Sequence, residues 1–173
     1  MNLDKEKLKN LDKLPPDIKR QFALYMNQWK EKKKESQIAT DFLSFVKHVW
    51  PDFVEGSHHK VVADKFNKIA KGEIKRLIIN MPPRHTKSEF ASFLLPAWMV
   101  GRNPKLKIIQ STNTTELSVR FGRKAKQLID SQEYQQAFKT RLKEDSQAAG
   151  KWETEQGGEY FAVGVEGAVT GRG

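Results

Sequence analysis

The chain has 173 residues with a formal net charge of +10, and 38% of its residues are apolar. That length and apolar content fit one domain with a helical extension and exclude a disordered polymer, while the absence of cysteine excludes disulfides and thiolate zinc sites. No apolar run suits a membrane span or a signal peptide, so we expect a cytoplasmic protein. The strong positive charge is typical of proteins that bind nucleic acid, a membrane surface or an acidic protein.

The first part of the chain predicts a basic helical extension over residues 1–36. Pro15-Pro16-Asp17 suits a helix start, because proline is favoured in the first turn and Asp at the positive end of the helix dipole. The basic run Lys30–Lys34 then indicates a helix end or a solvated linker. Apolar residues at helical spacing form one stripe along this helix: Ile18, Phe22, Tyr25 and Trp29.

A helical lead-in over residues 37–73 is predicted next. It comprises one helix over about 38–49, which Trp50-Pro51 stops, and another over about 57–71, which ends at Lys71-Gly72.

The pattern changes over residues 74–173, where short apolar runs alternate with helical periodicity. This order predicts an α/β fold with a parallel sheet flanked by helices. The expected elements are strands over 75–81, 106–111 and 159–163, and helices over 87–100 and 114–130, with a polar stretch over 141–150.

The loop between the first predicted strand and its helix corresponds to the phosphate-binding pattern G-x-x-x-x-G-K-[ST]. Its eight residues, Met81-Pro-Pro-Arg-His-Thr-Lys-Ser88, keep the lysine and the serine but place Met81 and Thr86 where the pattern has glycine. Loop N–H groups and the helix N-terminus would still present donors to phosphate, and two prolines would stiffen the loop. The alternative is a plain strand-to-helix turn that contains Lys-Ser by chance.

We expect Lys87 to contact the β- and γ-phosphates, Ser88 to ligate Mg²⁺, and Arg84 to contact the γ-phosphate. Lys87 and Arg84 are accordingly candidate catalytic residues. The candidate nucleotide-binding residues of the loop are Pro82, Pro83, Arg84, His85, Thr86, Lys87 and Ser88.

The loop and its flanks resemble the deviant Walker A region of phage terminase large subunits, the ATPases that pump DNA into procapsids. The resemblance covers most of residues 40–173, and residues 1–36 match no family that we can name. The similar stretches are Arg76–Ser88, Phe42–Pro51, His58–Lys60, Gln110–Asn113, Arg120–Arg123 and Gly167–Gly173.

This resemblance implies a P-loop NTPase of the additional-strand catalytic glutamate type, with ATP and Mg²⁺ as cofactors. The implied partners are double-stranded viral DNA, the portal protein and the small terminase subunit. A homo-oligomeric ring in the full-length protein and the cytoplasm of an infected bacterial host are implied as well.

The resemblance also suggests residues outside the loop. An adenine pocket is expected upstream of the first strand, where Trp50 and His59 stand, although His58 and His59 would equally fit the start of a helix. Arg172 is a candidate trans arginine finger that reaches a neighbouring subunit's site. Arg120 and Arg123 share one helix face, where solvation is expected more than phosphate contact.

The sequence lacks a recognisable Walker B strand. Such a strand is an apolar run that ends in acidic residues, which hold Mg²⁺ and position the attacking water. Leu128-Ile-Asp130 belongs to a helical segment, and the resemblance places Walker B beyond Gly173. We therefore expect a partial ATPase domain that binds nucleotide and hydrolyses it weakly or not at all. The alternatives are a basic DNA- or partner-binding module with a vestigial loop, or a helicase-like or kinase-like P-loop protein.

Overall fold

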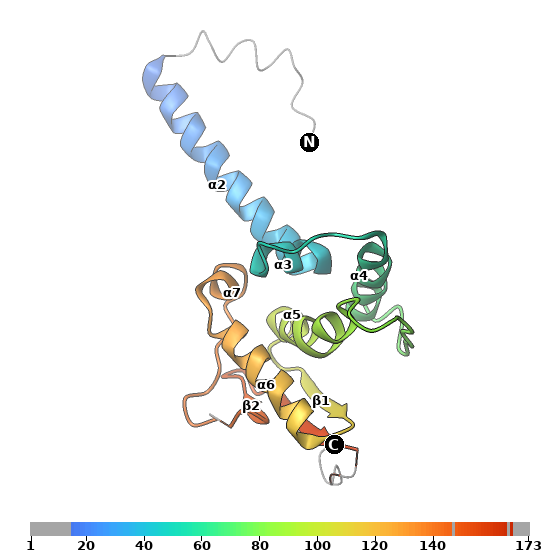
Figure 1. The fold of residues 1–173 in the computed structure, drawn as a ribbon. Coiled ribbons are helices and arrows are strands. Elements are labelled where there is room, and N and C mark those ends of the chain that lie inside the picture. Colours follow the sequence, from blue (N-terminus) through green and yellow to red (C-terminus); the bar gives the residue numbers. More distant parts are fainter. Residues whose placement is uncertain (1–14, 147, 166, 168–173) are drawn as a thin grey trace. The chain divides into compact units, whose positions relative to one another are not determined.

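The structure is a computed structural model, and it describes residues 15–146, 148–165 and 167 (Figure 1). The chain divides into two units, residues 1–36 and 37–173. Helix α2 spans Pro16–Thr40, so its last turn belongs to the second unit. The predicted helix end or linker at Lys30–Lys34 is wrong, because lysine and glutamate are strong helix formers and carry the helix through the basic run.

The apolar stripe of α2 lies largely open to solvent within the first unit. Ile18, Tyr25 and Trp29 are exposed, and Phe22 is half-buried. The Lys33 ammonium lies 5.0 Å from the centre of the Trp29 ring, a cation–π distance. This part of α2 therefore presents aromatic and basic side chains on an exposed helix.

In the second unit, α3 (Phe42–Val49) and α4 (Ser57–Ala70) confirm the two predicted lead-in helices, although Ile38 belongs to α2. Asp41 caps α3 by accepting hydrogen bonds from the Ser44 N–H at 2.8 Å and the Ser44 hydroxyl at 2.7 Å. Asn67 of α4 donates to Asp41 at 2.8 Å and accepts from the Phe42 N–H at 2.8 Å. The cap thus ties α3 to α4.

Partial burial raises the pKa of Asp41, but hydrogen bonds from Ser44 and Asn67 outweigh this effect and lower the pKa below its usual value. Replacing Asp41 by alanine should remove the N-cap and leave donors of Ser44 and Asn67 without their acceptor. We expect a loss of about 1–2 kcal/mol in the free energy of unfolding, measured by urea titration. Asp52→Ala, at an exposed site, should change it by less than about 0.5 kcal/mol, and equal losses in the two variants would contradict the capping role.

Aromatic side chains form the centre of the core in the second unit. The buried Phe42 ring lies 5.0 Å from Phe66, 5.4 Å from Phe90 and 5.4 Å from Trp98, each at a steep angle. Trp98 satisfies its indole N–H with the Ile38 carbonyl at 3.0 Å. Phe90 lies on the π-helix η2 (Glu89–Leu94) and Trp98 on α5 (Leu95–Arg102), so this core fixes the helix that follows the predicted phosphate loop.

A three-stranded sheet forms the other part of the second unit, in the order β1-β3-β2. β1 (Lys107–Thr112) and β3 (Glu159–Gly164) pair in parallel and confirm two predicted strands. The short strand β2 (Lys151–Glu153) and helix α7 (Gln132–Ala137) were not predicted. α6 (Thr115–Ile129), a predicted helix, packs against β1 and β3.

The contact between α6 and the sheet depends on one glycine. Trp152 of β2 stacks on Tyr160 of β3 at 4.7 Å and donates its indole N–H to the Gly122 carbonyl of α6 at 3.2 Å. A side chain at Gly122 would place its Cβ 2.4 Å from the Ala149 carbonyl oxygen. Gly122 is therefore needed for this close approach.

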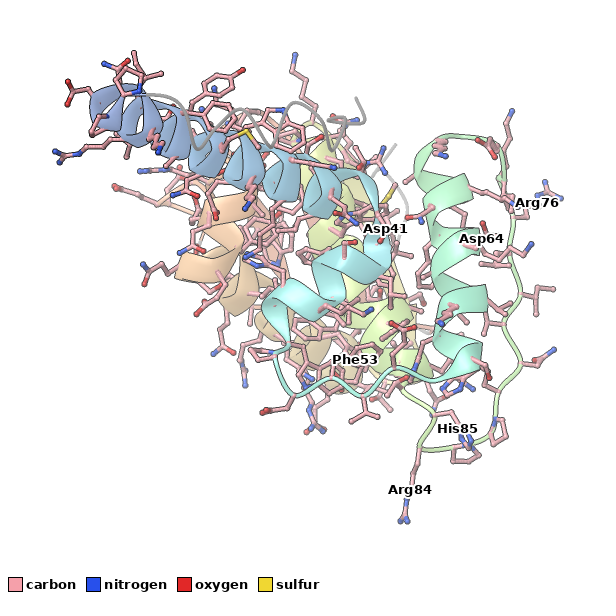
Figure 2. All side chains as sticks on the ribbon, turned by 90° about the horizontal axis from the view of Figure 1, so that it is seen from above. Asp41, Phe53, Asp64, Arg76, Arg84 and His85 are labelled. Carbon is pink, nitrogen blue, oxygen red and sulfur yellow. The ribbon has the colours of Figure 1, made fainter. Side chains whose placement is uncertain are left out.

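The predicted strand over residues 75–81 is wrong. In the described chain this segment is without strand pairing and runs beside α4, with Arg76 near one end and Arg84 beyond the other (Figure 2). Leu77 and Ile79 pack against the core, whereas Ile78 is 86% exposed. The apolar run therefore keeps the alternation of a strand, but it has no neighbouring strand to bond. The fold is mixed α/β with a small sheet.

No helix in the described ranges combines the length and the apolar character that a membrane crossing requires.

Candidate functional site

The loop that the sequence singled out encloses a hollow of about 560 Å³. It follows the extended segment at Met81 and ends where the helix begins at Lys87. Figure 2 shows Arg84 projecting from the body of the unit at the tip of this loop. All of the predicted loop residues line the hollow, together with Glu89: Pro82, Pro83, Arg84, His85, Thr86, Lys87 and Ser88.

Two loop residues have a left-handed backbone. Arg84 has φ 65° and Thr86 has φ 58°, and they are the non-glycine residues with positive φ in the described chain. This conformation costs an L-residue roughly 1–2 kcal/mol, and a β-branched residue such as threonine adopts it rarely. Thr86 occupies the position of the pattern's second glycine, so the loop takes a glycine-like conformation without the glycine.

A change of backbone hand follows directly. Thr86 is left-handed and Lys87 is helical. Successive N–H groups in such an alternation point toward one concavity and make a site for anions. The N–H groups of Lys87, Ser88 and Glu89 belong to the first helical turn, where no preceding helical carbonyl can accept them. The helix dipole adds positive potential at the same place.

Two cations and one carboxylate line the hollow. The Lys87 ammonium reaches back across the loop and donates to the Met81 carbonyl at 3.2 Å. Arg84 is exposed at the loop tip. Glu89, the one carboxylate among the residues that line the hollow, is paired with Lys124 of α6. Arg84 and Lys87 are therefore the cations that face this concavity.

His59 belongs to the same region but does not line the hollow. It is 6% exposed, and its ring packs against Phe53 at 4.8 Å and Phe90 at 5.1 Å. One ring nitrogen, Nε2, is 2.7 Å from the Thr86 hydroxyl, and the other, Nδ1, accepts the Gly56 N–H at 2.8 Å. Both ring nitrogens of His59, the residue predicted to contact a nucleotide base, are thus hydrogen-bonded within the protein.

Burial is the largest influence on His59 and lowers its pKa, and the neighbouring His58 and His85 lower it further against the raising effect of Glu55. A neutral ring agrees with the hydrogen bonds, because Nδ1 must be unprotonated to accept the Gly56 N–H.

The other candidate residues lie apart from the loop hollow. Trp50 lines another cavity of about 520 Å³, which shares Glu89 with the loop hollow and is also lined by Lys124. Arg120 and Arg123 are exposed on α6, as expected for a solvated face. Arg172 lies outside the described residues. Within the described ranges, no group of three His, Asp or Glu side chains is placed to hold a metal ion.

No protein-family model, curated protein or solved structure matches this chain significantly.

Sequence reasoning missed the contacts that connect the loop to the helices around it. The His59–Thr86 hydrogen bond joins residues 27 positions apart, and the Glu89–Lys124 pair joins residues 35 apart. Local periodicity carries no signal for such contacts. The wide turn η2 was also missed; π-helical turns are rare and often stand at functional sites.

Proposed function

We propose that residues 37–173 form the nucleotide-binding part of an ATPase motor of the terminase large-subunit type. In this proposal ATP binding and hydrolysis drive double-stranded viral DNA into a procapsid. The left-handed Thr86, directly before the helix that carries Lys87 and Ser88, is the observation that supports it best. Backbone strain of this kind is kept where the surrounding structure and the function require it.

Each part of the loop has a role in this proposal. The backbone N–H groups around Thr86 and the first helical turn receive phosphate oxygens, and Lys87 exchanges its bond to the Met81 carbonyl for one to the β- and γ-phosphates. Arg84 contacts the γ-phosphate from the loop tip. Pro82 and Pro83 limit the conformations of the empty loop and so lower the entropy lost on binding.

Mg²⁺ fits the residues present only in company with the nucleotide. Ser88 is exposed at the start of the helix and supplies one hydroxyl ligand, and Mg²⁺ in such sites takes its remaining ligands from phosphate oxygens, waters and further carboxylates. The ion would neutralise charge on the phosphates. In the same proposal, Arg172 is an arginine finger that reaches the site of a neighbouring subunit. The full-length protein forms a ring that contacts the portal protein and the small terminase subunit, in the cytoplasm of the infected host.

Isothermal titration of the whole chain with ATP and with adenosine tests the proposal. Charge-assisted hydrogen bonds contribute about 1.5–3 kcal/mol each, so losing the contacts of two cations to phosphate should weaken binding about a hundredfold or more. We expect ATP to bind and adenosine to bind at least that much more weakly, with little steady-state turnover. The proposal would be contradicted if the chain bound ATP and adenosine with equal affinity, or if it did not bind ATP.

A second candidate function is a basic module that binds DNA or an acidic partner while the loop is vestigial. The exposed lysine run Lys30–Lys34 on α2, beside the aromatic residues of its stripe, favours it. In that case the chain would bind DNA with an affinity that falls steeply with salt, through counterion release, and would show no affinity for ATP.

A further inference from the structure

His59 lies between the start of α4 and the loop. It is the third residue of α4, and its Nδ1 accepts the backbone N–H of Gly56, the residue that precedes the helix. This is one half of a capping box, in which a side chain in the first turn reaches back to the cap residue. The contact to Gly56 and the packing against Phe53 and Phe90 fix the ring in place.

The partners of His59 determine where its proton lies. The Gly56 N–H can only donate, so Nδ1 accepts and the proton is on Nε2. Nε2 then donates to the Thr86 hydroxyl, 2.7 Å away. The Thr86 hydroxyl in turn donates to the His85 carbonyl at 2.7 Å. Every donor in this chain of three hydrogen bonds meets an acceptor.

The last two hydrogen bonds, from His59 Nε2 to the Thr86 hydroxyl and from that hydroxyl to the His85 carbonyl, hold the residue with the least favourable backbone conformation. Thr86 is β-branched and left-handed, with φ 58°, and its hydroxyl bonds the carbonyl of its own peptide link to His85. A hydroxyl held at both ends, by the ring on one side and the carbonyl on the other, restricts rotation about the backbone between them. Glycine at this position would need no such support.

We infer that His59 is a positioning residue: its bond to the Thr86 hydroxyl holds Thr86 in the left-handed conformation that shapes the phosphate loop. The inference rests on the proposed function only in that phosphate binding makes the shape of the loop matter. It assigns His59 a role without contact to the nucleotide, and it explains how threonine stands where the pattern has glycine.

A double-mutant cycle tests it, with ATP and inorganic triphosphate as ligands for the whole chain. His59→Ala should weaken both ligands about tenfold when Thr86 is present, and less than twofold in the Thr86→Gly background, where no support is needed. Equal losses in the two backgrounds would overturn the inference. So would a loss for ATP alone, because triphosphate has no base and such a loss would mean that His59 contacts adenine.

Thr86→Val provides a second test that leaves the buried ring intact. It removes the hydroxyl but keeps the β-branch, so the affinity should fall as in His59→Ala, and adding His59→Ala should cause no further fall. An affinity equal to that of the unaltered chain would contradict the inference. Circular dichroism of each variant checks that it is folded.

Unfolding measurements separate this inference from the proposed function. If the unaltered chain binds neither ligand, the proposed function fails, and the same cycle in urea still tests the role of His59. His59→Ala should then lower the unfolding midpoint more with Thr86 present than in the Thr86→Gly background. Equal shifts would overturn the inference whatever the chain binds.

Discussion

Replacing Lys87 by alanine is expected to weaken ATP binding by about ten- to a hundredfold. The lysine ammonium already lies over the loop, bound to the Met81 carbonyl at 3.2 Å, and would exchange that contact for phosphate oxygens. A hydrogen bond to a charged group contributes about 1.5–3 kcal/mol, and each 1.4 kcal/mol is roughly a factor of ten in the dissociation constant. Isothermal titration at fixed ionic strength measures the change.

Lys105→Ala is the matched control, because it removes the same charge from an exposed site between α5 and β1. Its effect should stay within about twofold, the size expected of long-range electrostatics screened at physiological salt. Similar losses in the two variants would show that Lys87 acts only through net charge. An unchanged affinity in Lys87→Ala would mean that ATP binds without this lysine and would contradict the proposed site.

Replacing Phe42 by alanine should cost about 3–5 kcal/mol of the free energy of unfolding. The Phe42 side chain is fully buried against the rings of Phe66, Phe90 and Trp98, among others, so its removal leaves a cavity between several elements. Domains of this size are stable by only about 5–15 kcal/mol, so the loss removes a large fraction of the total. Urea unfolding followed by tryptophan fluorescence measures it.

Tyr25→Ala is the control for the core variant, because Tyr25 is also aromatic but is 62% exposed on α2. Its effect should stay within about 0.5 kcal/mol. Comparable losses in the two variants would mean that Tyr25 is covered in solution and that the aromatic stripe of α2 has a partner.

Local patterns predicted most helices and two of the strands. α4 and α6 have clear apolar spacing and recognisable ends. β1 and β3 are short apolar runs between turns. The segment over 75–81 has the same composition, but a strand requires a neighbour to bond, and pairing is set by tertiary structure. Composition therefore predicted a strand where the described chain has no strand pairing.

Elements without a strong pattern were missed. α7 has six residues and β2 has three, too few to show a period. Ser131, which caps α7 by accepting the Tyr134 N–H at 3.3 Å, was a usable signal for the helix. In the loop, the spacing of Lys87 and Ser88 was enough to single out these two residues as candidates. The support of Thr86 by His59 depends on the packing of α4 beside the loop, which local spacing does not encode.

The π-helical turn η2 determines how Lys87 and Ser88 are rotated about the helix axis relative to α5. In this turn the Leu95 N–H bonds the Phe90 carbonyl, five residues back rather than four. Each helical residue turns the chain by about 100°, so deleting one residue from this turn would swing Lys87 and Ser88 by about that angle relative to Trp98. Phe90 lies in the same turn, so the deletion would also disturb its contact with Phe42 in the core. The one extra residue of the π-helical turn thus determines the direction in which the side chains of the first helical turn point.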